Sequence, residues 1–130
     1  MRWPDIQEQT ASIVKRFDVR VSEIDMRAQN LSGGNQQKLV LGRELADSPA
    51  AIVAENPTRG LDINASEMIR DHLRQARDAG TAIVFYSSDI DELIDLADRV
   101  VVLRDGTLAE VPLDSRAVGN ALLMSAIGHQ

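Results

Sequence analysis

Leu-Ser-Gly-Gly-Asn-Gln-Gln-Lys occupies residues 31–38 and is the most informative segment of the sequence. Ser32 suits the N-cap of a helix, and apolar side chains recur at helical spacing over residues 35–46. Two glycines at a helix start let a ligand approach the backbone, while unpaired amides and the positive end of the helix dipole point outward. We therefore expect an anion site here. The alternative is a plain glycine turn before a surface helix.

Downstream of this helix, short apolar runs alternate with amphipathic helices. Residues 50–55 and 81–87 are predicted to be strands buried on both faces. A helix with Asn64 as its N-cap follows the first strand and ends near Gly80, and a helix capped by Ser88 follows the second. Because strands alternate with helices, we expect an α/β fold with a mainly parallel sheet flanked by helices.

Helices and a hairpin are predicted toward the two ends of the chain. Apolar spacing predicts a helix over residues 5–17. Asp105-Gly106 lies between two apolar runs, 99–103 and 107–111, and this dipeptide is typical of a β-hairpin. Asp114 is expected to cap a last helix.

Two groups of side chains receive structural roles. Phe85 and Tyr86 are expected in the core of their strand. The acidic side chains at the start of the helix after Ser88 are expected to form a solvated face that favours the helix dipole, not a metal site. These are Asp89, Asp91, Glu92 and Asp95.

Composition excludes several functional classes. The 14 basic and 20 acidic residues give a net charge of -6, which disfavours nucleic acid as a partner. Cysteine is absent, and His72 and His129 are too few for a metal cluster. The apolar runs are far shorter than a membrane span. We therefore expect a soluble protein that can still dock on a membrane protein.

LSGGNQQK resembles the signature loop of ATP-binding-cassette (ABC) ATPases, and its NQQK ending resembles the monosaccharide-importer branch. Residues 56–62, NPTRGLD, resemble the end of the Walker B strand and the D-loop, and residues 87–106 resemble the switch segment. The resemblance covers the chain from about Asn30 to Val111. It implies a partial P-loop NTPase fold from the C-terminal part of the second nucleotide-binding domain.

The resemblance also implies how the chain is divided. Residues 1–46 correspond to the end of the helical subdomain with the signature, residues 47–113 to the Walker B, D-loop and switch part of the catalytic core, and residues 114–130 to a C-terminal helix. The family's phosphate-binding loop, G-x-x-x-x-G-K-[ST], has no counterpart. Because the family places this loop upstream, Met1 is interpreted as marking a truncation, an excised piece or a split gene.

The signature would act in trans, on a nucleotide held by a neighbouring domain. Asp62, in the D-loop, would reach the opposing domain, although an Asp is also a common turn former. The residues that the resemblance assigns to nucleotide binding are therefore Leu31, Ser32, Gly33, Gly34, Asn35, Gln36 and Asp62.

Three positions of the chain's own site depart from the family pattern. Glu55 stands at the Mg²⁺-supporting Asp, as a weak metal ligand, and Asn56 stands at the catalytic Glu. A neutral amide cannot take a proton, and losing general-base assistance typically costs about 10²- to 10⁴-fold in rate. Ser88 replaces the switch histidine and carries no positive charge. The alternatives are an inserted residue that makes Glu55 the base, a polar strand end, and Ser88 as a helix N-cap only.

The resemblance implies ATP and Mg²⁺ as cofactors and places the chain in a sugar importer, inactive by itself. The implied partners are a second nucleotide-binding domain, transmembrane permease subunits and, indirectly, a periplasmic sugar-binding protein. Such a subunit is cytoplasmic and peripheral to the inner face of the cell membrane. One alternative is a non-catalytic remnant that docks on a permease or partner ATPase. Another is an ABC protein of repair or translation, which the acidic charge and NQQK disfavour.

Overall fold

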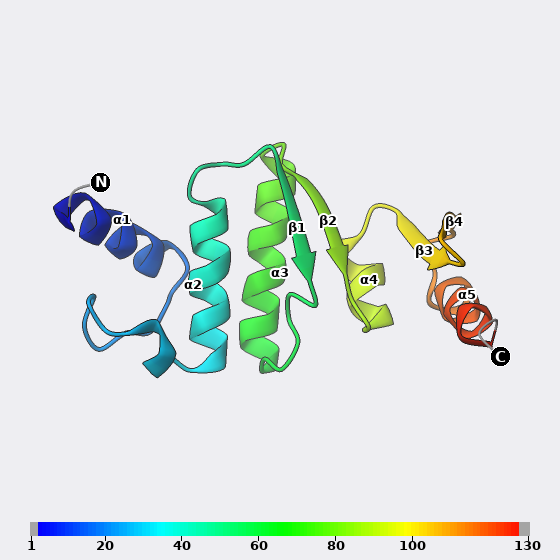
Figure 1. The fold of residues 1–130 in the computed structure, drawn as a ribbon, viewed down its shortest axis with the longest axis horizontal. Helices are drawn as coiled ribbons and strands as arrows, with labels where there is room; N and C mark the ends of the chain where they lie inside the picture. Colours follow the sequence, from blue (N-terminus) through cyan, green and yellow to red (C-terminus); the bar gives the residue numbers. More distant parts are fainter. Residues whose placement is uncertain (1–2, 128–130) are drawn as a thin grey trace. The chain divides into compact units, whose positions relative to one another are not determined.

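The computed structural model describes residues 3–127 of the chain. The chain divides into two compact units, Met1–Tyr86 and Ser87–Gln130. Crossing a bilayer needs about 20 apolar residues in one helix, and no helix within residues 3–127 meets that requirement. The elements in chain order are α1 (Trp3–Arg16), η1 (Ala28–Asn30), α2 (Gly33–Leu45), β1 (Ala51–Glu55), α3 (Ile63–Asp78), β2 (Ala82–Tyr86), α4 (Ile90–Leu96), β3 (Val100–Arg104), β4 (Thr107–Val111) and α5 (Ser115–Ile127) (Figure 1).

An apolar core holds the first unit together between α1, α2 and the loop that joins them. Phe17, only 1% exposed, follows directly after α1. Ile52 of β1 and Ala76 of α3 pack against this core, so that it joins the glycine-bearing helix to the strands. The buried members of the core are Ile13, Phe17, Val19, Leu31 and Leu45.

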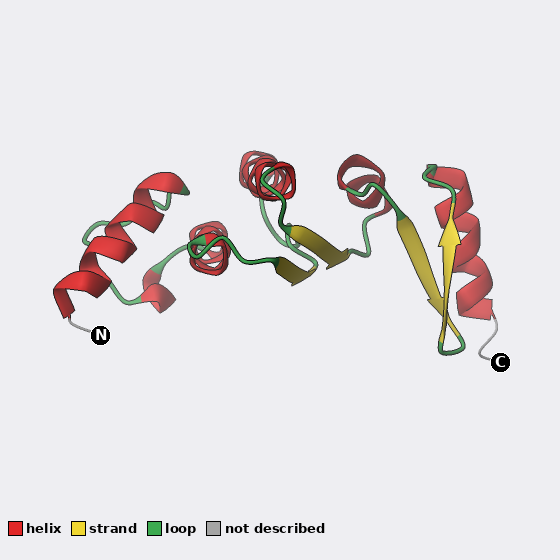
Figure 2. Cartoon of the chain, turned by 90° about the horizontal axis from the view of Figure 1, so that it is seen from above, coloured by secondary structure: helices red, strands yellow, loops and turns green. Residues whose placement is uncertain are grey.

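β1 and β2 form a parallel pair in which Glu55 lies opposite Tyr86. The helix α3 covers one face of this pair, as the view from above shows (Figure 2). The other face is open, with Val53 84%, Val84 66% and Tyr86 60% exposed. The prediction that both strand faces and Tyr86 are buried is therefore wrong for the described residues, because no described element of this unit covers that face.

α3 begins one residue after Asp62, whose side chain is its N-cap. The Oδ1 atom of Asp62 accepts a hydrogen bond from the amide of Ala65 at 2.9 Å. Asn64, the predicted cap, already lies inside the helix, because the chain is extended at Asp62 and turns helical at Ile63. The helix is amphipathic as predicted, since Ala65, Ile69 and Leu73 are buried along one face.

In the second unit, the N-cap of α4 is Asp89 and not the predicted Ser88. Asp89 Oδ1 accepts from the amides of Asp91 at 2.9 Å and Glu92 at 3.3 Å. The carboxylate can bond both amides at the positive end of the helix, which favours it as the cap. Glu92 is only 2% exposed and accepts a hydrogen bond from Ser87 Oγ, so it does not belong to a solvated face.

The hairpin and the last helix form as predicted. β3 and β4 pair antiparallel around Asp105 and Gly106, which have φ angles of 48° and 75°. Such left-handed angles at both turn residues are typical of a tight two-residue hairpin. Asp114 Oδ1 accepts from the amide of Ala117 at 2.8 Å at the start of α5. Val118 of α5 is fully buried in this unit.

Candidate functional site

The start of α2 presents two unbonded amides. Ser32 is the N-cap, and its Oγ accepts from the Asn35 amide at 3.4 Å and from Asn35 Nδ2 at 3.0 Å. The Gln36 amide makes the first helical bond, to Ser32 O at 2.9 Å. The amides of Gly33 and Gly34 precede it and bond to no group within residues 3–127. An anion at this point would meet two N–H donors and the positive end of the helix dipole.

Nothing inside the described chain requires glycine at these two positions. Neither residue has a positive φ angle, and a Cβ built on Gly33 would meet no atom within 4 Å. At Gly34 the nearest atom would be Ala65 Cβ, at an ordinary 3.6 Å. Because glycine is about 1 kcal/mol less favourable than alanine in a helix, the glycine pair indicates close approach by something outside the chain.

The side chains around the glycines are largely occupied within the chain. Leu31 is buried in the core. Asn35 Oδ1 accepts from the Arg20 amide at 2.9 Å, and Gln36 Nε2 donates to Leu31 O at 3.0 Å. Of the predicted nucleotide contacts, Gly33 and Gly34 have backbone amides without a partner within residues 3–127. Nucleotide contact stays a prediction for each of the assigned residues, Leu31, Ser32, Gly33, Gly34, Asn35, Gln36 and Asp62.

Two residues of the same segment have roles that the sequence did not reveal. Gln37 Nε2 donates to Pro57 O at 2.9 Å, across 20 residues of chain. Lys38 is only 7% exposed, and its Nζ donates to Asp18 O at 3.1 Å and lies 3.6 Å from Asp18 Oδ2. Lysine is rarely buried, and neither partner is near in sequence, so no local signal could have indicated these contacts.

The segment after β1 lies against the start of α2. A Cβ on Gly34 would lie 3.9 Å from Leu61, and Gln37 reaches Pro57. The structure therefore brings the signature segment and the D-loop segment together within one unit. Asp62 ends this segment as the N-cap of α3, with extended backbone and not within a turn. Its contact with an opposing domain stays a prediction.

Glu55 and Asn56 lie at the carboxyl end of β1. Glu55 is exposed, and Asn56 has a left-handed φ angle of 45° that asparagine tolerates well. The Asn56 amide donates to Tyr86 O at 2.7 Å and extends the strand pairing by one residue. Within residues 3–127, no three acidic, histidine or cysteine side chains gather into a metal site. A metal role for Glu55 therefore stays a prediction.

Ser88 belongs to the second unit. It is exposed and precedes Asp89, the N-cap of α4. Its neighbour Ser87 is buried and accepts a hydrogen bond from the Asp89 amide at 3.0 Å. The switch role of Ser88 stays a prediction.

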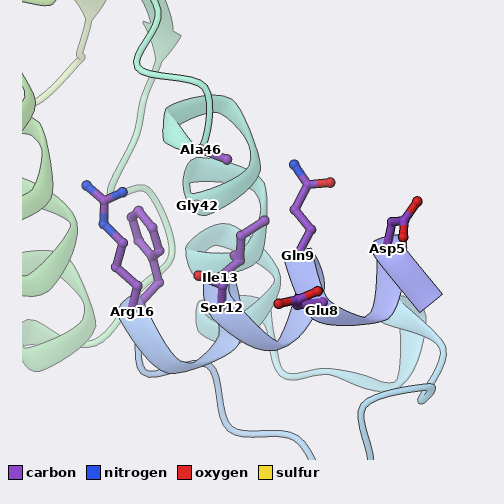
Figure 3. Close-up of a pocket in the computed structure, with 9 residues that line it drawn as sticks. Asp5, Glu8, Gln9, Ser12, Ile13, Arg16, Gly42 and Ala46 are labelled. Carbon is purple, nitrogen blue, oxygen red and sulfur yellow. The ribbon is translucent and has the colours of Figure 1, made fainter. Parts of the chain in front are cut away.

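A hollow of about 450 Å³ lies between α1 and α2 (Figure 3). Ile13 and Gly42 form part of its wall, and Asp5, Glu8 and Arg16 contribute charged groups (Figure 3). Phe17 also lines it. None of the residues assigned to a site from the sequence lines it. The hollow is therefore not the predicted nucleotide site.

The fold and the helix start together define an α/β protein in which a helix N-terminus with two free backbone amides lies beside the segment that follows a strand. No protein-family model matches the chain. The glucose import ATP-binding protein TsgD13 of Haloferax volcanii is 44% identical over 104 residues, 78% of this chain and 19% of the relative. The ribose import ATP-binding protein RbsA 1 of Mesorhizobium japonicum is 41% identical over 109 residues, 84% of this chain and 21% of the relative.

Solved structures show the same fold. The ATP-binding cassette MJ0796, solved as a dimer in a post-hydrolysis state with ADP and Pi, has a TM-score of 0.72 and 26% identity over 88% of this chain and 50% of that one. A putative metal-chelate type ABC transporter, at 18% identity and a TM-score of 0.68 over 87% of this chain and 45% of that one, shows the fold alone. The chain is therefore homologous to a segment of sugar and nucleoside import ATP-binding proteins and has the fold of ABC ATPases.

These findings confirm the family resemblance and the predicted fold class. The chain spans about a fifth of the length of the curated relatives that it matches. The activity, substrates and partners of a whole importer are therefore proposals for this chain.

Proposed function

We propose that the chain acts within the ATP-binding subunit of a carbohydrate importer, where its signature loop contacts ATP held by a neighbouring nucleotide-binding domain. The observation that carries this proposal is the glycine pair at the start of α2. Its two amides are unbonded within residues 3–127, and side chains are missing at Gly33 and Gly34 where the chain itself has room for them. The matched relatives are named as glucose and ribose import proteins, which supports a carbohydrate as the transported substrate.

The residues at this helix start fit a phosphate group. A phosphate is a compact anion that accepts several hydrogen bonds, and the amides of Gly33 and Gly34 and the Ser32 hydroxyl are suitable donors. A Cβ built on Gly33 would meet no described atom within 4 Å, so a ligand has room to approach the backbone there. A Cβ on Gly34 would be in ordinary contact with Ala65 Cβ at 3.6 Å. ATP binding by this helix alone would be incomplete, because the 130 residues contain no G-x-x-x-x-G-K-[ST] loop.

The chain's own nucleotide site is proposed to bind nucleotide with little turnover. When bound, Mg²⁺ would neutralise phosphate charge, and Glu55 would supply one carboxylate ligand to it. Asn56 cannot take a proton from water, and Ser88 can only donate or accept a hydrogen bond. Hydrolysis supported by this chain would therefore occur at the partner's site.

The proposed partners are a second nucleotide-binding domain, transmembrane permease subunits and, indirectly, a periplasmic sugar-binding protein. The assembled subunit would be cytoplasmic and peripheral to the inner face of the cell membrane. Within it, residues 1–46 would form the end of the helical subdomain, residues 47–113 part of the catalytic core and residues 114–130 a C-terminal helix. The net charge of -6 speaks against nucleic acid as a partner.

The test measures ATP hydrolysis by a full-length importer subunit that carries this sequence, with Gly33→Ala and Gly34→Ala combined. Two methyl groups would keep phosphate away from the amides, so we expect hydrolysis to fall about 10- to 100-fold. Gly119→Ala is the matched control, because its Cβ would meet only Ile90 Cδ1, at 3.8 Å, in the second unit. Unchanged hydrolysis in the double variant would contradict the proposal.

A second candidate function is a non-catalytic module that docks on a permease or a partner ATPase. The open apolar face of β1 and β2, where Val53 is 84% exposed, favours this alternative. A ligand stabilises a folded protein in proportion to the logarithm of its concentration over its dissociation constant. A subunit that carries this sequence and shows no thermal shift with Mg-ATP would therefore support the docking module.

A further inference from the structure

Gln37 connects two segments that the proposed function assigns to different nucleotide sites. Its amide group donates to Pro57 O at 2.9 Å, and the two residues are 20 positions apart. Gln37 lies in α2, directly after the signature residues assigned to the trans site. Pro57 is buried and directly follows Asn56. Asn56 is the residue that stands where the family has its catalytic Glu. A buried carbonyl without a donor costs free energy, which gives this bond structural weight.

The segment that Gln37 contacts is built from tight turns. Asn56 has a left-handed φ angle of 45°. The Arg59 amide donates to Asn56 O at 3.1 Å, and the Leu61 amide donates to Thr58 O at 3.2 Å. The Gln37 bond joins this segment to α2. Leu61 also lies close to the start of α2, since a Cβ built on Gly34 would be 3.9 Å from Leu61 Cδ2.

Two other residues in the first turns of α2 anchor it to the loop after α1. Asn35 Oδ1 accepts from the Arg20 amide at 2.9 Å, and the buried Lys38 donates to Asp18 O at 3.1 Å. The first turns of α2 are therefore fixed to the loop after α1 by Asn35 and Lys38. Because these turns are fixed, the Gln37 bond sets where the segment after β1 lies relative to the glycine pair.

We propose that Gln37 is a positioning residue that holds residues 56–62 in register with the glycine pair. Through it, the trans contact at the start of α2 and the chain's own site at Glu55 and Asn56 are placed together. This inference rests on the proposed function for its effect on hydrolysis, but not for the structural link. Gln36, one residue earlier, bonds Leu31 O only five positions away and lacks such a link.

Amide hydrogen exchange in the chain tests the structural link. Gln37→Glu keeps the side-chain shape and removes the N–H donor, whereas Gln37→Lys keeps a donor. We expect the amides of Arg59 and Leu61 to exchange about tenfold faster in Gln37→Glu, the scale of one hydrogen bond. Gln37→Lys should retain slow exchange. Gln36→Glu, which adds the same charge, should leave both amides unchanged.

Two results of this experiment would overturn the inference. One is unchanged exchange of Arg59 and Leu61 in Gln37→Glu. The other is faster exchange spread evenly over the chain with a lower melting temperature, which would indicate a general loss of stability. Gln37→Met removes the donor without adding charge and gives the same decision if the glutamate variant does not fold.

Hydrolysis by a full-length subunit that carries this sequence tests the functional effect. Gln37→Glu should lower kcat about tenfold while KM for ATP stays the same, because the side chain bonds Pro57 O and would act by positioning the segment after β1. Gln37→Lys should restore kcat, and Gln75→Glu, exposed on α3, is the charge control. An equal kcat in Gln37→Glu would overturn the functional effect.

The failure of this inference and that of the proposed function are distinguishable. If the double glycine variant leaves hydrolysis unchanged, the proposed function fails, and hydrogen exchange still decides the structural link. If the glycine variant lowers hydrolysis and Gln37→Glu does not, the role of Gln37 in hydrolysis alone is overturned.

Discussion

Glycines of α2 serve two different purposes, and their surroundings separate them. A Cβ on Gly42 would lie 2.5 Å from Ile13 Cγ2 and 2.8 Å from Phe17 Cδ2, so the core between α1 and α2 requires glycine there. A Cβ on Gly33 would meet nothing. Gly42 is therefore explained by packing inside the chain, while Gly33 needs an explanation outside it.

This difference leads to a stability prediction. Gly42→Ala forces the core apart, and we expect it to lower the free energy of unfolding by about 1–3 kcal/mol. Gly33→Ala, the matched control, should change it by less than about 0.5 kcal/mol. Urea denaturation followed by circular dichroism measures both values. Equal stability of the two variants would show that α1 and α2 do not approach as closely as the structure has them.

The cap of α3 supports a second prediction at single residues. Asp62→Ala removes the acceptor for the Ala65 amide, so the free energy of unfolding should fall by about 1 kcal/mol. Asn64→Ala lies inside the helix and should have little effect or be slightly stabilising. Thermal or urea unfolding of both variants checks the assignment. A larger loss of unfolding free energy in Asn64→Ala than in Asp62→Ala would indicate that Asn64 is the N-cap, as predicted from the sequence.

At the scale of elements, the sequence predicted what depends on local spacing. The buried face of α3 and the turn at Asp105-Gly106 follow from helical period and turn chemistry, and both are present. The cap positions were wrong at Asn64 and Ser88, because a cap depends on where the backbone turns helical and not on residue type alone. The exposure of Tyr86 could not be predicted, since an apolar strand does not reveal what covers it.

For the candidate site, local sequence predicted the exposed helix start but not its supports. Ser32 as N-cap and the free glycine amides follow from residue types and helix geometry. The bonds of Gln37 and Lys38 join residues 20 positions apart, and they exist only because the chain folds back onto α2. Such long-range contacts have no signature in one sequence.

The packing of α3 against the end of α1 predicts a pH dependence of stability. The rings of His72 and Phe17 lie 4.2 Å apart between centroids. Burial first, and then the nearby Arg16, lower the pKa of His72 below its usual 6.5, with Lys38 adding to this and Asp71 opposing it. The His72 side chain therefore stays neutral in the folded protein over a pH range in which the same side chain takes up a proton in the unfolded chain.

The sign follows from linkage between proton binding and folding. Because the unfolded state binds more protons, stability falls as pH decreases from about 6.5 to the lowered pKa of the folded state. We expect the urea midpoint of the wild-type chain to drop between pH 7.5 and pH 5.5 by more than that of His72→Phe, which keeps an aromatic ring beside Phe17. An identical pH dependence in both proteins would contradict this prediction.

At the scale of the whole molecule, the open face of β1 and β2 is the feature that argues most strongly against a monomeric chain in solution. Parallel sheets in proteins are covered on both faces. Here Val53 and Val84 stand on a two-stranded parallel sheet at 84% and 66% exposure, with unpaired strand edges beside them. Exposed apolar strands of this kind promote association between chains.

We therefore expect the chain by itself to associate at high concentration through this face. Combining Val53→Thr and Val84→Thr keeps the β-branched shape and makes the face polar, and it should raise the dissociation constant at least about tenfold. Ile63→Thr is the matched control, because Ile63 is 83% exposed but lies at the start of α3 and not on the sheet. Sedimentation over a range of concentrations measures the association. If the control weakens association as much as the double variant, the association is nonspecific and does not depend on the sheet face.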